Sequence, residues 1–188
     1  MWYLYDDPWA AYGHLDNAFT ADECDKIIKL SKSIELRDAT VDDNFRLEKD
    51  YRKNQIGWVE PSAETNWIFR KITDIVTQSN SQLWKFDIET IPELQFTNYV
   101  NVEDQYKRHI DMGKTQHHRK LSFSIQLSDE NDYEGCNLQF IQSEFIETAP
   151  RKRGSFILFP SFILHQVTPL ISGERNALVG WVCGPKFK

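Results

Sequence analysis

The residues from Ile91 onward alternate between apolar and polar positions with a period of two. They fall into short segments, rich in aromatic and β-branched residues, that are separated by turn-forming stretches such as SDENDYEG and LISGER. This alternation is typical of β-strands with two different faces. The segments expected to be strands are ELQFTNYV, YKRHID, KLSFSIQLS, CNLQFIQ, GSFILFPS and NALVGWVCG. The second half of the chain is therefore expected to form a β-barrel or jelly roll.

The first ninety residues carry helical periodicity instead. Thr20 and Glu23 have the spacing of a capping box ahead of an apolar run, which predicts a helix over residues 21–33. A second helix is predicted over residues 63–83, because apolar residues recur there on one helical face. These residues are Ile68, Ile72, Ile75 and Val76. Both helices are expected to pack outside the barrel.

Residues 35–54 are highly charged and lack sustained periodicity, so they are interpreted as a solvated loop, with a mobile substrate-facing segment as the alternative. The chain length suits one domain and no internal repeat is present. One domain is therefore expected over residues 1–188, with helical support and the charged loop in 1–90 and the β core in 91–188. The expected fold class is mostly β with flanking helices.

Charge and composition exclude several classes of protein. The formal net charge is −6, with basic and acidic residues mixed along the chain, so a nucleic-acid partner is not expected. No signal-peptide pattern or membrane-length apolar run occurs, which predicts a soluble, cytoplasmic protein without a membrane partner. The three cysteines are too few and too far apart for a disulfide framework, so all are expected to be thiols.

The segment KLSFSIQLS has two interpretations. Its apolar residues point to one side and its polar residues, which are Ser122, Ser124, Gln126 and Ser128, point to the other. The polar side is either a solvent-exposed face or the inner wall of a barrel that holds a ligand. Periodicity alone does not choose between them.

Two His-x-Asp pairs occur in the chain. With 15 Asp and five His in 188 residues, about 0.4 such pairs are expected by chance, so the motif alone is weak evidence. His109 and Asp111 lie in an expected strand, where residues i and i+2 share a face and can converge on one ion. His14 and Asp16 lie just before a capped helix, outside any strand pattern, and are expected to be surface residues.

Two residues further along the chain complete a candidate site. His165 follows several expected strands later and can return across the barrel to His109 and Asp111, giving the two His and one carboxylate that hold iron(II) in oxygenases. Arg175 can hold a carboxylate of 2-oxoglutarate through a two-pronged, charge-assisted pair. His117 and His118 are expected to be exposed loop residues.

With these residues in order, residues 94–182 resemble the iron(II)- and 2-oxoglutarate-dependent dioxygenases of the prolyl 4-hydroxylase-like group, particularly the PKHD-type hydroxylases. The resemblance implies a double-stranded β-helix, or jelly roll, with O2 as the second cosubstrate and ascorbate as a reductant. It implies that His109, Asp111 and His165 bind the iron and that Arg175 binds 2-oxoglutarate, all four being catalytic. Tyr99 matches a tyrosine that lines the cosubstrate pocket in relatives.

The chain also departs from its relatives. Cys136 stands where many of them have a glycine, so the local turn or pocket is expected to differ. Some relatives use a tyrosine or threonine on the strand after His-x-Asp to hold the cosubstrate carboxylate. Ser122, Ser124 and Gln126 are the polar groups available here, and Ser124 and Gln126 are carried forward as candidates without a final choice. Trp181 either walls the pocket or packs in the core.

The activity implied by the resemblance is hydroxylation of a C–H bond in a prolyl or other residue of a protein or peptide; a small-molecule substrate is left open, as is the oligomeric state. Asp111 argues against a halogenase, which lacks this carboxylate. Trp181 stands where nucleic-acid demethylases of this chemistry have a second arginine. The alternatives from other classes are a non-catalytic jelly-roll module that binds a metal or ligand, and an interaction protein that docks through its aromatic N-terminus.

Overall fold

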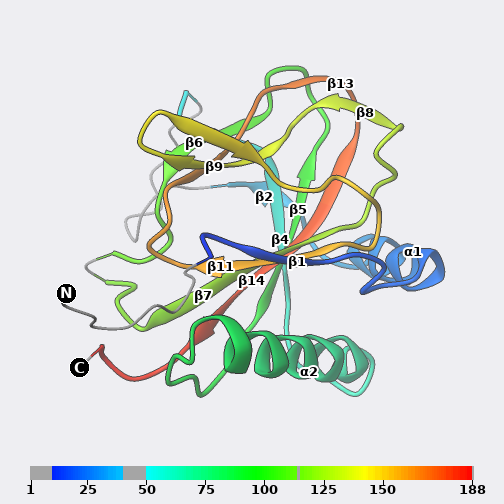
Figure 1. Ribbon diagram of the computed structural model, residues 1–188. Coiled ribbons are helices and arrows are strands. Elements are labelled where there is room, and N and C mark those ends of the chain that lie inside the picture. Colours follow the sequence, from blue (N-terminus) through cyan, green and yellow to red (C-terminus); the bar gives the residue numbers. More distant parts are fainter. Residues whose placement is uncertain (1–9, 40–49, 114, 188) are drawn as a thin grey trace.

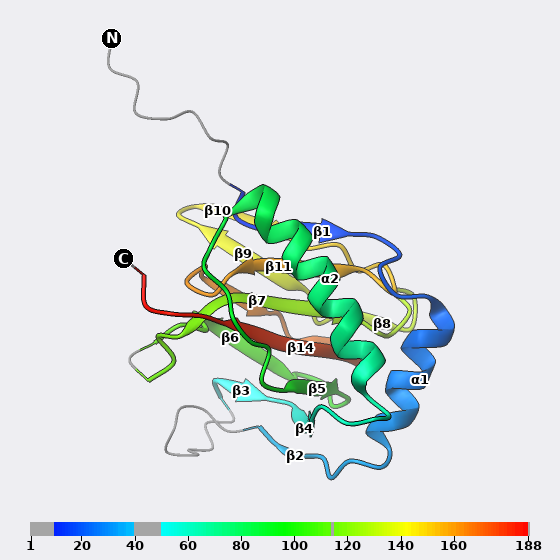
Figure 2. The same cartoon turned by 90° about the horizontal axis from the view of Figure 1, so that it is seen from below.

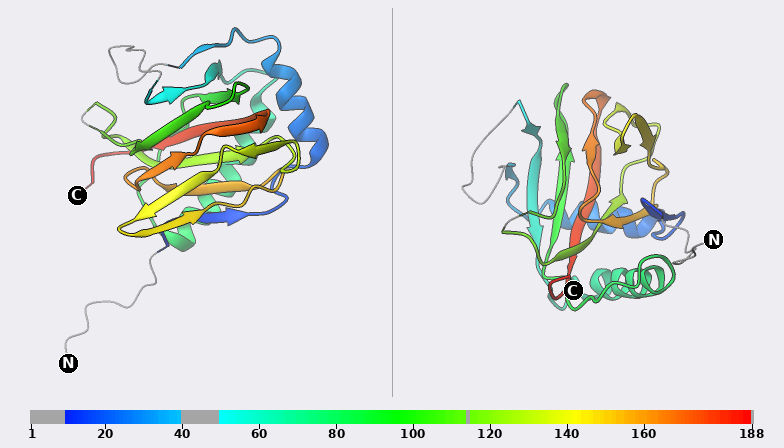
Figure 3. Two further views of the ribbon diagram at one scale, coloured as in Figure 1. Left: turned by 90° about the horizontal axis from the view of Figure 1, so that it is seen from above. Right: turned by 60° about the vertical axis from the view of Figure 1, so that its left-hand side comes forward.

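In the part of the chain that the structure describes, two facing β-sheets, a separate two-stranded sheet and two helices form the architecture (Figure 1). The computed structural model describes residues 10–39, 50–113 and 115–187. Every strand pairing within the sheets is antiparallel. The smaller sheet lies on one side of the larger sheet and helix α2 lies on the other (Figures 2 and 3).

The larger sheet has the strand order β1-β11-β7-β14-β5-β4-β2. In that order its strands are β1 (Gly13–Leu15), β11 (Phe156–Pro160), β7 (Arg119–Gln126), β14 (Arg175–Cys183), β5 (Leu94–Tyr99), β4 (Gln55–Val59) and β2 (Arg37–Asp38).

The smaller sheet has the strand order β10-β9-β12-β6-β3, and β13 pairs with β8 in a separate two-stranded sheet. These strands are β10 (Phe145–Thr148), β9 (Leu138–Gln142), β12 (His165–Val167), β6 (Gln105–His109), β3 (Arg52–Lys53), β13 (Leu170–Gly173) and β8 (Tyr133–Gly135). The prediction of a mostly β jelly roll with flanking helices is confirmed.

Helix α1 (Ala21–Ser31) begins with the predicted capping box. The Thr20 hydroxyl accepts a hydrogen bond from the Glu23 backbone N–H at 3.2 Å, and the Glu23 carboxylate accepts one from the Thr20 N–H at 2.8 Å. Phe19, directly before the cap, is buried in the core. Local side-chain chemistry therefore fixes where this helix starts.

Helix α2 (Asn66–Leu83) lies across the outer face of the larger sheet (Figure 2). Ile68, Ile72 and Val76 are fully buried against that sheet, and Ile75 is partly buried. The core between helices and sheet includes the apolar side of β7, whose members are Leu121, Phe123, Ile125 and Leu127. Burial of each such side chain contributes roughly 1.5–3 kcal/mol. Both predicted helices are confirmed, with α2 starting three residues later than expected.

The first ninety residues contribute more to the sheets than expected. The prediction of a loop over residues 35–54 is wrong at both ends, where β2 and β3 form, while residues 40–49 lie outside the described part of the chain. Strands β1 and β4 were also not predicted. Short edge segments of this kind gain their structure from hydrogen bonds to strands distant in sequence, so local periodicity does not reveal them.

The cysteines and the two helices bear on expectations drawn from composition. Cys24, Cys136 and Cys183 are buried free thiols, as predicted. Across residues 10–39, 50–113 and 115–187, neither helix combines the length and the apolar character that spanning a membrane would need.

Replacing Thr20 by alanine should lower the free energy of unfolding by about 0.5–2 kcal/mol, because it removes the side-chain acceptor at the start of α1. Urea unfolding of the variant and the parent measures the change. Thr77→Ala, on the exposed side of α2, is the matched control and should not lower the stability, because alanine is the better helix former. Equal stability of Thr20→Ala and the parent would contradict this role for the capping box.

Candidate active site

The polar side of β7 faces the interior of the jelly roll. The Ser122 and Ser161 hydroxyls are 2.9 Å apart, Ser124 lines the central cavity, and Gln126 bonds to a buried arginine. All three β7 side chains are buried. The barrel-wall interpretation of KLSFSIQLS is therefore right, and the solvent-face interpretation is wrong.

A cavity of about 370 Å³ lies between the two sheets. Its lining includes His109, Asp111 and His165 at one position, and Arg175 and Tyr99 at another. The structure thus brings the residues selected from the sequence into one cavity. A volume of this size suits a small organic ligand.

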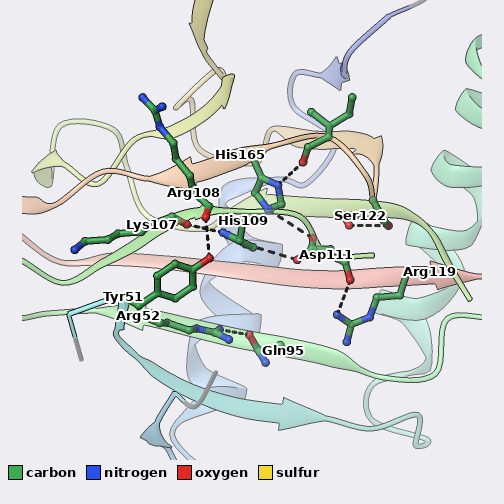
Figure 4. Close-up of polar contacts among 12 residues, drawn as sticks. Tyr51, Arg52, Gln95, Lys107, Arg108, His109, Asp111, Arg119, Ser122 and His165 are labelled. Carbon is green, nitrogen blue, oxygen red and sulfur yellow. Dashed lines mark hydrogen bonds and ion pairs between the residues drawn. The ribbon is translucent and has the colours of Figure 1, made fainter. Parts of the chain in front are cut away.

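The three candidate metal ligands converge where β6 and β12 pair. His165 lies opposite His109 in the register of these two strands. His109, Asp111 and His165 each offer a ligand atom within 4.8 Å of the others. The Nε2 atoms of His109 and His165 each lie 3.6 Å from one carboxylate oxygen of Asp111, the first from Oδ1 and the second from Oδ2 (Figure 4).

Backbone carbonyl groups fix the orientation of both imidazoles. His109 Nδ1 lies 2.7 Å from the Lys107 carbonyl oxygen, and His165 Nδ1 lies 2.9 Å from that of Ile163 (Figure 4). Because a carbonyl only accepts, each Nδ1 carries the proton and each Nε2 keeps its lone pair. This is the arrangement that metal-binding histidines use.

Asp111 does not lie in the strand that was predicted to hold it. Strand β6 ends at His109, and the Asp111 backbone N–H instead donates to the Ser161 carbonyl oxygen at 2.9 Å. The strand-parity explanation for the His109–Asp111 pair is therefore wrong for the second residue. The hydrogen bond to Ser161, which directly follows β11 and is distant in sequence, therefore positions Asp111 beside the two histidines.

Electrostatics favours the metal-binding protonation states of this group. Burial, together with the positive charge that His165 can carry, lowers the pKa of His109 to about 3. Burial raises the pKa of the Asp111 carboxyl, but His165, His109 and Ser122 outweigh it, so the net shift is downward. At neutral pH the site therefore offers a neutral His109 imidazole and a charged Asp111 carboxylate.

The second His-x-Asp pair lies away from this group. His14 pairs with Ile157 in β1, so it does lie in a strand, contrary to the sequence interpretation. Both His14 and Asp16 are exposed, as expected, and Asp16 accepts a hydrogen bond from the Ser155 hydroxyl at 2.9 Å. No group of three metal-binding side chains in the described residues includes either of them.

Arg175 is a fully buried cation at the start of β14. Its Nη2 and Nε donate to the Gln126 side-chain oxygen at 2.9 and 3.3 Å, and its guanidinium carbon lies 5.3 Å from the Tyr99 ring centre. Gln126 donates its own N–H to the Pro150 carbonyl oxygen at 3.2 Å. Gln126 therefore orients the guanidinium through its oxygen and uses one of its two N–H donors on Pro150.

A β-bulge brings a second arginine into the cavity. The register of β7 and β14 shifts between Val182 and Cys183, so that β7 contains one extra residue beside Cys183. Arg119 consequently lines the cavity, with its guanidinium carbon 3.9 Å from the Trp181 ring centre. The ammonium group of Lys120, the next residue, lies over the Phe187 ring instead. Bulges commonly redirect side chains beside active sites.

The cavity wall also contains Trp181, which the sequence indicated as one of two possibilities, and Trp58 and Arg119, which it did not indicate. Trp181 lines the cavity, as one of its two interpretations proposed, and lies 6.3 Å from the Trp58 ring. Trp58 was missed because β4 was missed. Arg119 was missed because strict alternation along β7 assigns it to the outer face. His117 and His118 are exposed, as expected.

The replaced glycine has a structural consequence. Cys136 has φ of 51°, a left-handed conformation that favours glycine. Its thiol is buried, and burial raises its pKa to about 11, so the thiol stays protonated at neutral pH. Cys136 therefore occupies a backbone conformation that a glycine would adopt without strain.

The donor groups suit the metal and cosubstrate that the resemblance implies. Two imidazole nitrogens and one carboxylate within 4.8 Å of one another are the donor set of non-haem iron(II) oxygenases. A fully buried guanidinium in the same cavity requires an anionic partner, and a dicarboxylate supplies one.

Comparison with known families gives the same class. Residues 94–183 match the model of the 2OG-Fe(II) oxygenase superfamily. A PKHD-type hydroxylase from Synechococcus sp. (strain CC9902) is 42% identical over 82 residues, which cover 43% of this chain and 37% of the relative. Another PKHD-type hydroxylase, from Synechococcus sp. (strain CC9605), is 30% identical over 127 residues, which cover 66% of this chain and 57% of the relative. The chain thus spans only part of the length of these curated relatives.

Solved structures confirm the fold. A prolyl 4-hydroxylase from Pseudomonas putida aligns with a TM-score of 0.74 at 20% identity, covering 93% of each chain. A prolyl hydroxylase from Trichoplax adhaerens, in complex with a hypoxia inducible factor peptide, aligns with a TM-score of 0.79 at 16% identity, covering 93% of this chain and 84% of the other.

The segment from residue 94 to 183 therefore belongs to the 2OG-Fe(II) oxygenase superfamily. Within it, the chain is similar to the PKHD-type hydroxylases, and the family prediction made from the sequence is confirmed.

Proposed function

We propose that this chain is an iron(II)- and 2-oxoglutarate-dependent dioxygenase that hydroxylates a C–H bond of a protein or peptide substrate. The observation that carries the proposal is the position of both histidine Nε2 atoms 3.6 Å from the carboxylate of Asp111, in a cavity that also contains the buried Arg175. The name of the matched family and the names of the relatives support the same activity.

His109, Asp111 and His165 would hold the iron. Three ligands on one side of an octahedral ion leave three positions open for other molecules. When bound, the iron supplies the redox chemistry that couples oxidation of 2-oxoglutarate to succinate and carbon dioxide with hydroxylation of the substrate. The protein contributes the fixed ligand orientation and a cavity that limits access of water.

Arg175 would hold 2-oxoglutarate by its distal carboxylate, with Tyr99 beside it. Its Nε–H and one Nη2–H are directed to Gln126, and the remaining guanidinium N–H groups would bind the carboxylate. Ser124 lines the same cavity and offers a hydroxyl donor. Gln126 would act on the cosubstrate through Arg175, since its side-chain oxygen accepts from the guanidinium and its amide nitrogen donates to the Pro150 carbonyl oxygen.

The substrate would enter beside Trp58, Trp181 and Arg119. These residues line the cavity, and Arg119 Nη1 donates to the Asp111 carbonyl oxygen at 3.3 Å. Two indole rings offer flat apolar surfaces that suit a ring such as that of proline. The peptide bound to the similar Trichoplax enzyme is consistent with a peptidyl substrate. A prolyl residue is therefore the substrate we propose first.

The activity has a direct test. Purified protein supplied with iron(II), 2-oxoglutarate and ascorbate should form succinate, and proline-containing peptides should increase the rate and gain 16 mass units. The rate should fall to background in Asp111→Ala. Normal metal binding without succinate formation, with or without peptides, would favour the non-catalytic binding module.

Metal binding distinguishes the two His-x-Asp pairs. His109→Ala and His165→Ala should each lose most of the bound iron, because each leaves only two ligands. His14→Ala and Asp16→Ala should retain it, since these residues are exposed and lie outside the cavity. Iron content, measured on variants with circular dichroism spectra like that of the parent, decides. Normal iron content in both cavity variants would remove these histidines from the site.

Arg175→Ala should weaken 2-oxoglutarate binding while changing iron binding little. Truncating one partner of a desolvated charge pair costs about 2–5 kcal/mol, which corresponds to an increase in Kd of roughly 30- to 4,000-fold. Arg175→Lys should recover only part of the lost affinity for 2-oxoglutarate, because lysine keeps the charge but lacks the planar guanidinium. Titration of the anaerobic iron complex gives the Kd. Unchanged affinity in the alanine variant would place the cosubstrate elsewhere.

A further inference from the structure

Tyr106 and Arg52 form a stack on the metal-site residue His109. The Tyr106 ring lies nearly parallel to the His109 imidazole, with ring centres 3.5 Å apart and an interplanar angle of 17°. The Arg52 guanidinium carbon lies 4.4 Å from the Tyr106 ring centre. All three residues line the cavity. An arginine over a tyrosine face is a favourable cation–π arrangement.

The two ends of this stack are anchored by different means. Arg52 Nη2 donates to the Gln95 side-chain oxygen at 2.7 Å (Figure 4), and Arg52 Nε donates to the Asn54 side-chain oxygen at 3.1 Å. Arg52 pairs with Tyr106 across β3 and β6. The short strand β3 therefore holds a cation over the ring of a tyrosine that also stacks on a candidate metal ligand.

His109 needs such support more than His165 does. His165 is the first residue of β12, but it pairs on both sides, with Phe140 of β9 and with His109 of β6. It is 4% exposed, and its ring centre lies 4.7 Å from that of Phe159. His109 is the last residue of β6, and Ile110 after it is exposed. Within the described part of the chain, the His109 imidazole has ring contacts to Tyr106 and to His165. Since His165 is itself a candidate ligand, Tyr106 is the ring that supports His109 from outside the metal site.

We propose that Tyr106 is a positioning residue for the metal ligand His109, and that Arg52 strengthens its effect by stacking on the opposite side. The Lys107 carbonyl fixes one nitrogen of the imidazole, which still allows the ring to tilt about that contact. The Tyr106 face removes this tilt and keeps Nε2 directed at the metal. The inference rests on the proposed function, because it requires His109 to be a ligand.

The test is titration of metal-free protein with cobalt(II), whose visible spectrum reports affinity and ligand geometry. Tyr106→Leu should raise the Kd for cobalt(II) by about 10- to 100-fold, the usual effect of losing a residue that orients a ligand, and should change the spectrum. Tyr106→Phe should retain affinity within about 2-fold, because the stacking ring remains. Arg52→Gln should raise the Kd by about 2- to 5-fold.

A matched control separates this role from general packing. Tyr133 has an arginine, Arg151, over its ring at 4.3 Å but is not recorded in contact with a candidate metal ligand. Tyr133→Leu should leave the cobalt(II) affinity unchanged. Parent-like affinity and spectrum in Tyr106→Leu would overturn the inference. If Tyr106→Leu does not fold, the remaining variants decide. The inference is supported if Arg52→Gln weakens cobalt(II) binding while Tyr106→Phe and Arg52→Lys bind as the parent does. Parent-like affinity in Arg52→Gln overturns it.

Failure of this inference differs from failure of the proposed function. If the parent binds cobalt(II) and His165→Ala abolishes that binding, the metal site stands whatever the Tyr106 variants show. If the parent does not bind cobalt(II), or if His165→Ala binds it equally well, the proposed function fails, and the positioning role fails with it.

Discussion

The antiparallel pairing of β12 with β6 is the constraint on which the rest of the site depends. It sets His165 opposite His109, although many residues and several strands separate them in the chain. The backbone carbonyls of Lys107 and Ile163 then direct both Nε2 atoms toward Asp111. Strand register therefore supplies the proximity, and short local hydrogen bonds supply the orientation. A site built in this way is preorganised, because few side-chain rotations remain free to be lost when a ligand binds.

The polar side chains on the inner face of β7 are buried, and polar groups removed from water need hydrogen-bond partners. The solution differs along the strand: Ser122 bonds to Ser161 near Asp111, and Gln126 accepts from Arg175 at the far end of the cavity. Ser124 between them faces the cavity itself. The outer face of the same strand packs into the core beneath the two helices. One strand thus separates a closed apolar core from a polar chamber, and the helices on the outer side stabilise the wall of that chamber.

The sequence predicted the fold class, both helices, the six longer segments that became strands, and the four residues that meet in the cavity. These features depend on local signals: the capping box at Thr20, the helical spacing around Ile72, the alternation along β7, and the ordered motifs of a known family. Features set by distant contacts were not predictable. Asp111 is aligned by Ser161, the short strands β1 to β4 form on neighbours far away in the chain, and Trp58 enters the cavity only because β4 pairs with β5. Arg119 was not identified because one irregular step reverses the alternation at the start of β7.

That irregular step in β7 also matters for comparing this chain with others. The extra residue beside Cys183 means that Arg119 and Lys120 exchange sides relative to a regular strand. An alignment that places a one-residue gap differently here would exchange a cavity arginine for a lysine packed beneath Phe187, with no change in overall charge. A one-residue deletion at this point would change which side chain faces the cavity, while the candidate metal ligands, which lie outside β7, would stay in place. Homologous sequences should therefore be read by side-chain direction at this position and not by column alone.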